Sequence, residues 1–168
     1  MRGSISQINY SSVVTRVGLV FVLSNEKGVT RIIFGEKGFR NHIDGLNGAS
    51  VTEGGAAASE MARELGLYFD GKLSEFKTPI DISEGTPFQN SVWMKLLDIP
   101  YGGTATYREI AENIGRSGAA RAVGNAVGAN PIPIVIPCHR VLASNGLGGY
   151  SSGIDIKKVL LRVEGTLS

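Results

Sequence analysis

The chain has 168 residues, of which 42% are hydrophobic, and this is enough for one domain or two small ones with a buried core. Its net charge of +2 permits nucleic-acid binding without arguing strongly for it. No apolar run approaches the roughly 20 residues that cross a bilayer. Residues 1–9 also lack the apolar core of a secretory signal. We therefore expect an intracellular, cytoplasmic protein that makes no membrane contact.

The amino-terminal half has the pattern of a small sheet covered by a helix. Two β-rich runs, residues 18–23 and 29–34, lie on either side of a short turn and predict an antiparallel hairpin. Residues 35–55 are rich in Gly, Asn and Asp and predict a connecting loop. Residues 56–69 predict a helix that ends at Asp70 and Gly71, with inward residues at helical spacing: Met61, Leu65 and Tyr68.

The carboxy-terminal half begins after an extended crossing. Residues 72–85 have no helical period and contain Pro79, so we place the boundary between the two halves near residue 83. Thr86 and Pro87 predict a helix start, because an N-cap residue precedes proline at the first helical position. This helix should end before Pro100 and bury one apolar face: Phe88, Val92, Trp93, Leu96 and Leu97.

Two further short helices are predicted over residues 107–114 and 118–127. Residues 115–117, with one glycine, separate them, which is the outline of a helix-turn-helix. The first helix should point Ile110, Ala111 and Ile114 inward. The second is rich in Gly and Ala, so its backbone could approach another surface closely or pack tightly in the core.

A proline-rich stretch precedes the single cysteine of the chain. Residues 130–137 contain three prolines, which exclude a helix and hold the segment extended up to Cys138. A last helix is predicted over residues 154–164, with an apolar side formed by Ile156, Val159, Leu160 and Val163.

Cys138 can be a packed thiol, a reactive thiol or a lone metal ligand, because one cysteine forms no internal disulfide. Zinc is not expected, since only His42 and His139 could join it and they are far apart in the chain. A reactive thiol needs a nearby base or cation, and His139 and Arg140 are adjacent. Consecutive side chains point apart, so these residues must lie in a bend or act through a water. Both a cysteine nucleophile and a buried structural thiol remain open.

The combination of motifs around this cysteine resembles a known family. Residues 136–141 read Ile-Pro-Cys-His-Arg-Val; Asn130 and a proline precede them, and the motifs at residues 149–151 and 160–164 follow. Together they resemble the O6-alkylguanine-DNA alkyltransferases, also called methylated-DNA-protein-cysteine methyltransferases. The resemblance is dense from about residue 86 to 165 and weaker before it.

This resemblance implies an α+β fold in two domains. Residues 1–83 would form a small ribonuclease-H-like domain of sheet and helix. Residues 84–168 would form a helical DNA-binding and alkyltransferase domain with a winged-helix-like helix-turn-helix. The Cys and His residues that hold zinc in the amino-terminal domain of some members are missing here.

The resemblance also implies an activity. Members bind double-stranded DNA through the minor groove and flip O6-alkylguanine, and for this chain also O4-alkylthymine, out of the duplex. They then transfer the alkyl group irreversibly to their own cysteine. No cofactor or metal is implied. We expect a monomer that acts once, because the thioether product has no easily hydrolysed bond.

The catalytic roles transfer by position. Cys138 would accept the alkyl group, His139 would withdraw its proton through a bound water, and Glu164 would orient the imidazole. Asn130 would brace the segment that carries the cysteine, or alternatively cap the preceding helix. Tyr107 would crowd the phosphate of the flipped nucleotide and hydrogen-bond the base, which helps it leave as neutral guanine.

Binding roles transfer in the same way. Arg121 would fill the vacated place in the base stack. Tyr150 and Ser151 would belong to a loop over the base, with Ser151 donating toward O6, and the main-chain carbonyls of Cys138 and Val141 would accept from the guanine amino group. The other residues implied in contact with substrate or DNA are Lys157 at the pocket edge, Thr106, Ala120 and Gly124.

The sequence departs from the family pattern at two places, and two other functions stay open. Ser152 stands where glycine is common, and the loop after Cys138 is a residue shorter than in some relatives, so the preferred alkyl size stays open. A lesion-binding helix-turn-helix protein without chemistry and a cysteine hydrolase are the alternative functions.

Overall fold

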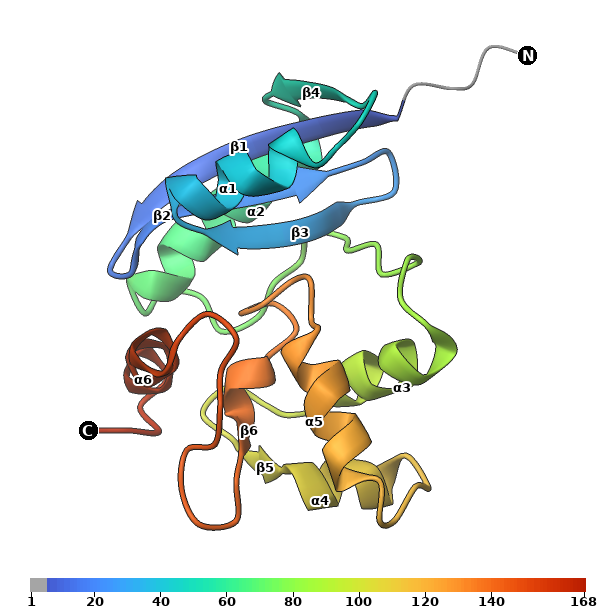
Figure 1. Ribbon diagram of the computed structural model, residues 1–168. Coiled ribbons are helices and arrows are strands. Elements are labelled where there is room, and N and C mark those ends of the chain that lie inside the picture. The colour runs from blue at the N-terminus through green and yellow to red at the C-terminus, as the bar shows by residue number, and fades with distance from the viewer. Residues whose placement is uncertain (1–5) are drawn as a thin grey trace. The chain divides into compact units, whose positions relative to one another are not determined.

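A computed structural model describes residues 6–168 of the chain (Figure 1). The chain divides into two compact units, Met1–Asp81 and Ile82–Ser168. Each contains both helices and strands, so the predicted mixed α+β class is confirmed. The first five of residues 1–9, which the sequence marks as a polar start, lie outside the described residues. Among residues 6–168, no helix combines the length and apolar character that crossing a bilayer requires.

The first unit is built on a four-stranded sheet with the order β3-β2-β1-β4. Strands β1 (Gln7–Thr15), β2 (Gly18–Ser24) and β3 (Val29–Phe34) are antiparallel neighbours, while β4 (Ser50–Glu53) pairs parallel to β1. The predicted hairpin is therefore confirmed as β2 and β3. Strand β2 is buried along most of its length. Figure 1 shows why, because helix α1 (Glu36–Asp44) lies in front of the sheet and α2 (Ala56–Phe69) lies behind it.

Two features of this unit correct the sequence-based expectations. Residues 35–55 are not a plain loop, since they hold α1 and β4. Helix α1 has no fully buried residue and contains Gly38, and Phe39 and Ile43 are its only apolar side chains at helical spacing, too few for the sequence to predict a helix. It is anchored by Phe39, whose ring stacks 4.1 Å from that of Phe21, centroid to centroid. Strand β1 was not predicted, because its exposed Ser12 and half-buried positions weaken the alternation.

The predicted helix over residues 56–69 is confirmed as α2, and Met61, Leu65 and Tyr68 are all fully buried in it. The extended residues that follow return along the sheet, where Ile80 forms a parallel bridge with Val29. Within this unit the sheet and α2 therefore share one core.

Helix α3 (Pro87–Leu96) opens the helical part of the second unit. It begins as predicted, because Thr86 accepts a hydrogen bond from the Gln89 amide and the Gln89 side chain accepts one from the Thr86 amide. Its buried side chains are Val92, Trp93 and Leu96, whereas the predicted inward residue Leu97 is 40% exposed.

Helices α4 (Tyr107–Asn113) and α5 (Ala120–Gly128) follow. The predicted start of α5 at residue 118 was two residues early. Gly118 has φ of +88°, a left-handed conformation that does not continue into a helix. The turn is therefore longer than the three residues predicted.

The segment that carries the cysteine follows α5. Cys138–Arg140 form one turn of 3-10 helix, η1, which is the bend that the Cys-His-Arg sequence required. Strand β6 (Val141–Leu142) comes next and pairs in parallel with β5 (Ala105–Thr106). Helix α6 (Ile154–Val163) closes the chain. The second unit thus places η1 between α5 and α6 in sequence, with β6 tied to the start of α4.

The buried face of α6 differs from the predicted one. The fully buried helix residues are Lys157, Leu160 and Leu161, while three residues of the predicted apolar side are only half-buried: Ile156, Val159 and Val163. The inward face is thus rotated, and it carries charge. Hydrophobic periodicity alone does not predict this face, because lysine is rarely buried without partners.

Candidate active site

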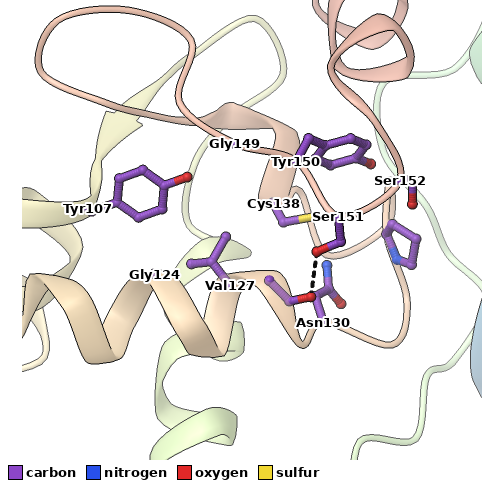
Figure 2. Close-up of a pocket in the computed structure, with 11 residues that line it drawn as sticks. Tyr107, Gly124, Val127, Asn130, Cys138, Gly149, Tyr150, Ser151 and Ser152 are labelled. Carbon is purple, nitrogen blue, oxygen red and sulfur yellow. Dashed lines mark hydrogen bonds between the residues drawn. The ribbon is translucent and has the colours of Figure 1, made fainter.

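A pocket of about 220 Å³ lies in the second unit and exposes the cysteine sulfur to its interior (Figure 2). Cys138 is otherwise buried, with 7% of its surface accessible. Helix α5, the segment after it, η1 and the loop before α6 supply most of the wall. The lining residues are Tyr107, Gly124, Val127, Gly128, Asn130, Pro133, Cys138, Gly149, Tyr150, Ser151 and Ser152.

Asn130 braces the backbone that leads to the cysteine. Its Nδ2 donates to the carbonyl oxygen of Ile136 at 2.8 Å, and its Oδ1 accepts from the amide of Ile132 at 2.9 Å. Between these two contacts Ile134 has φ of +75°, which is rare for a β-branched residue. The side chain of Asn130 thus binds forward along the segment rather than back onto the end of α5.

His139 is fully buried and binds the carboxylate of Glu164, the residue that ends α6, with 2.7 Å between Nε2 and Oε1. Burial alone would raise the pKa of the Glu164 carboxyl, but hydrogen bonds from His139 and Arg140 and their charges lower it to about 2. An ionised carboxylate only accepts, so Nε2 carries the proton and Nδ1 presents its lone pair. Nδ1 is buried and has no hydrogen-bond partner among residues 6–168. The imidazole is therefore set to accept a proton at Nδ1.

Both reacting groups are neutral at rest. Burial raises the pKa of the Cys138 thiol, and hydrogen bonds from Asn130 and Tyr150 and the charge of Lys157 only partly offset this. Burial also lowers the pKa of His139, against the hydrogen bond and charge of Glu164 that raise it. Because neither group is charged at rest, the thiol proton would have to leave as the sulfur forms its bond to an electrophile, which makes the S–H more acidic. The cation that acts on the thiol is Lys157, not the adjacent Arg140 suggested by the sequence.

Lys157 is not at the pocket edge, as the resemblance implied, but completely buried. Its ammonium donates to the carbonyl oxygens of Val141 (2.7 Å), Leu147 (2.5 Å) and Gly149 (3.0 Å). Burial lowers its pKa to about 8. The carbonyl of Val141, expected to read the guanine amino group, already accepts this bond, and an oxygen with two lone pairs leaves one for a ligand.

The loop before α6 lies over the pocket. The Ser151 hydroxyl donates to the carbonyl oxygen of Gly128 at 2.6 Å, so in this structure it points toward the end of α5 (Figure 2). Tyr107 faces the same loop from the start of α4. A Cβ on Gly148 would stand 3.2 Å from its hydroxyl oxygen, and the φ of +71° at Gly148 also favours glycine there. Burial raises the pKa of Tyr107, which keeps its hydroxyl protonated as a donor.

Six of the sequence-derived candidates line the pocket: Tyr107, Gly124, Asn130, Cys138, Tyr150 and Ser151. Arg121 and Thr106 do not, because Arg121 is exposed on α5 and Thr106 caps α4 through the amide of Glu109. Ala120 starts α5 and also lies outside the pocket wall. Sequence reasoning missed Val127, Gly128 and Pro133. Val127 and Gly128 follow Gly124 at helical spacing, and that spacing could have identified them.

The pocket wall therefore offers a thiol and hydrogen-bond donors, while the imidazole of His139, the residue after Cys138, is buried and does not line it. In residues 6–168 no group of three or more His, Cys, Asp or Glu is arranged to hold a metal ion.

Comparisons with known proteins agree with this site. A protein-family model, described as the DNA-binding domain of 6-O-methylguanine DNA methyltransferase, matches residues 87–166. A methylated-DNA-protein-cysteine methyltransferase of Methanosarcina barkeri is 45% identical over 158 residues, which cover 92% of this chain and 96% of the relative. Another, from Mycolicibacterium paratuberculosis, is 42% identical over 94% of this chain and 92% of its own length.

Solved structures extend the likeness to the fold. The Mycobacterium tuberculosis O6-methylguanine methyltransferase has a TM-score of 0.81 at 39% identity, over 96% of this chain and 94% of that one. The OGT of the same organism in complex with DNA has a TM-score of 0.80 at 41% identity, over 93% and 92%. With relatives of this identity and coverage, the chain belongs to the methylated-DNA-protein-cysteine methyltransferase family.

Proposed function

We propose that this protein repairs alkylated double-stranded DNA by transferring the alkyl group of O6-alkylguanine, and of O4-alkylthymine, to Cys138. The observation that carries the proposal is the position of the Cys138 sulfur in a pocket wall, with His139 and Glu164 bonded behind it. Family membership supports the same reaction.

The proposed transfer balances as follows. The thiol proton passes through a bridging water to Nδ1 of His139, the buried nitrogen that has no hydrogen-bond partner within residues 6–168. Sγ of Cys138 bonds to the alkyl carbon while the bond from that carbon to O6 breaks, and its electron pair remains on the purine. The purine takes a proton from the hydroxyl of Tyr107 and leaves as neutral guanine. Solvent returns the Tyr107 proton and receives the one on His139.

The product explains why each molecule acts once. Cys138 ends as a thioether, which has no acidic proton and no bond that water cleaves easily. Glu164 stabilises the transient imidazolium, because its carboxylate stays ionised throughout the neutral pH range.

DNA is the proposed partner, and a relative of 41% identity has been crystallised with it. Helices α4 and α5 would form the helix-turn-helix, with α5 in the minor groove and the base flipped into the pocket. Arg121, exposed on α5, would fill the gap left in the stack. Thr106, Ala120 and Gly124, near the start of α4 and on α5, would lie close to the DNA backbone.

The two units correspond in this proposal to the two domains of the family. Residues 1–83 would be the ribonuclease-H-like domain, and residues 84–168 the winged-helix-like catalytic domain. The protein would act as a monomer.

Intact-mass measurement after incubation with duplex DNA that holds O6-methylguanine tests the function. We expect the mass of one methyl group on Cys138, at a stoichiometry of one per chain and no second turnover. Cys138→Ala should bind the DNA and gain no mass. No adduct on the native chain would favour a lesion-binding protein, and repeated turnover without a stable adduct would favour a hydrolase.

A further inference from the structure

Arg140 is buried next to His139 in the chain, and its guanidinium donates hydrogen bonds to Glu164 and to the backbone of Ile99. Nε donates to Glu164 Oε2 at 2.9 Å, and Nη2 donates to Glu164 Oε1 at 2.8 Å, so the fork of the guanidinium grips both oxygens. Nη1 donates to the carbonyl oxygen of Ile99 at 2.6 Å. The guanidinium carbon lies 5.9 Å from the ring centroid of Tyr101, whose hydroxyl donates to the carbonyl of Val163 at 2.9 Å. These contacts tie η1 to α6 and to the turn after α3.

One oxygen of the Glu164 carboxylate contacts both His139 and Arg140. Glu164 Oε1 lies 2.7 Å from His139 Nε2 and 2.8 Å from Arg140 Nη2. The other oxygen is held by Arg140 Nε and, at 3.3 Å, by the amide of Gly102. The carboxylate therefore cannot rotate without breaking the Arg140 fork. The direction in which Oε1 faces the imidazole is set by Arg140 and not by His139 alone.

We propose that Arg140 is a positioning residue for the alkyl transfer, whose two-pronged contact fixes the Glu164 carboxylate against the imidazole of His139. This inference rests on the proposed function and deepens it. Arg140 does not line the pocket, and it acts on the thiol only through Glu164 and His139. A positive charge on the far side of the carboxylate offsets part of the negative charge that the imidazole feels. His139 thus remains neutral at rest and still accepts the thiol proton during transfer.

The charged and titratable groups around His139 are few. Cys138 and Arg140 flank it on η1, and Lys157 and Glu164 reach it from α6. Arg140 and Lys157 lower the pKa of His139, while Glu164 raises it. Removing the Arg140 charge should therefore raise the pKa of the imidazole.

Two substitutions separate the geometry of Arg140 from its charge. Arg140→Lys keeps a cation but cannot grip both oxygens. We expect its maximal single-turnover transfer rate to fall by about tenfold or more, with the DNA concentration at half-maximal rate within about twofold of the native value. Arg140→Gln removes the charge, and the acid limb of its pH-rate profile should move to higher pH, because His139 becomes more basic.

A matched control is available in the other unit. Arg63 forms the same forked contact with Glu60, with Nε at 3.0 Å and Nη2 at 2.6 Å from the carboxylate oxygens, but at the surface. Arg63→Lys should leave the rate and the pH profile unchanged. Imidazole nitrogen shifts of His139 by NMR give a readout that a merely structural role of Arg140 would not move.

The inference is overturned if folded Arg140→Lys transfers at the native rate with an unchanged profile. It is also overturned if its rate falls only in proportion to the unfolded fraction. If Arg140→Gln does not fold, Arg140→Lys and its His139 shifts decide alone. A failure of the proposed function looks different, because the native chain itself would then take up no methyl group.

Discussion

The ammonium nitrogen of Lys157 lies 3.0 Å from the carbonyl oxygen of Gly149, the residue that precedes Tyr150 in the loop over the pocket. A second bond from the same nitrogen reaches Leu147 in that loop, and a third reaches Val141 in β6. The buried Lys157 ammonium thus connects two residues of this loop, Leu147 and Gly149, to β6, the strand that follows η1. The pocket wall on this side depends on a charge that faces no solvent.

Lys157→Met should loosen this loop. The substitution leaves three carbonyl oxygens without their donor, one of them on the buried Val141, and we expect a loss of about 1–3 kcal/mol in the free energy of unfolding. Alkyl transfer should slow, because Tyr150 and Ser151 lose their fixed position. Urea unfolding measures the loss of stability, amide hydrogen exchange over residues 143–153 measures the loosening of the loop, and the single-turnover rate measures the slower transfer.

The neighbouring residue supplies the control for this experiment. Lys158 is half-buried on the same helix, and Lys158→Met should change stability by no more than about 0.5 kcal/mol. Equal stability and equal loop exchange in the two variants would contradict a clamp at Lys157.

Glu164 predicts a specific dependence of stability on pH. Its folded pKa of about 2 lies below its ordinary value of 4.5, so it stabilises the fold fully above pH 4.5. That contribution, on the order of 3 kcal/mol at one pKa unit per 1.4 kcal/mol, is lost as the pH falls from about 4.5 toward 2. Glu164→Gln should therefore be less stable than the native chain at pH 7, and the two should converge in acid. Urea unfolding at several pH values checks this.

The surface carboxylate of Glu60 serves as the control for Glu164. Arg63 lowers its pKa too, but the pair is exposed to solvent, which screens the interaction. Glu60→Gln should follow the native curve at every pH. A constant gap between Glu164→Gln and the native chain down to pH 2 would show that the carboxylate titrates normally.

Methylation of Cys138 should lower the melting temperature. Cys138 is buried, with 7% of its surface accessible, and shares the pocket wall with Asn130 and Tyr150, so an added methyl group overpacks this wall. A cost of about 1–3 kcal/mol corresponds to a fall of about 2–10 °C for a chain of this size. Calorimetry on the methylated and native proteins after removal of DNA tests it. Cys138→Ala carried through the same incubation should not change, and an unchanged melting temperature of the methylated native chain would refute the prediction.

Local signals predicted some elements well and failed for others. The start of α3 could be predicted from local sequence, because the capping box that begins it is formed by Thr86 and Gln89, which are only three residues apart. The anchor of α1 is different, because Phe39 has meaning only once β2 brings Phe21 against it. Such a contact between distant residues leaves no local period.

The same distinction applies to the site. Family motifs located Cys138 and Asn130 in the sequence, and both line the pocket. The burial of Lys157 could not be predicted, because its partners are main-chain carbonyls, which have no residue type. The fork of Arg140 on Glu164 spans 24 residues, and the sequence showed Arg140 only as a neighbour of the thiol. The burial of Lys157 and the fork of Arg140 thus escaped sequence reasoning, whereas the Asn130 brace and the His139–Glu164 pair followed from the family motifs.

The strained backbone at Ile134 predicts that a glycine variant is more stable than an alanine variant, the reverse of the usual order. Ile134 is buried, 1% exposed, and its φ of +75° carries a cost of about 1–3 kcal/mol for a residue with a side chain. Ile134→Ala loses the buried side chain and keeps most of the strain, whereas Ile134→Gly loses the side chain but relieves the strain. We therefore expect Ile134→Gly to be the more stable of the two by about 0.5–1 kcal/mol.

Ile132, two residues earlier, should show the usual order. It is equally buried but is absent from the positive-φ residues of the described chain, so its glycine variant should be less stable than its alanine variant by about 0.5–1 kcal/mol. Urea unfolding of the four variants measures both differences. If glycine were worse than alanine at both positions, Ile134 would not be strained in solution. Asn130, whose side chain binds on either side of Ile134, would then hold a relaxed segment in front of Cys138 rather than a strained one.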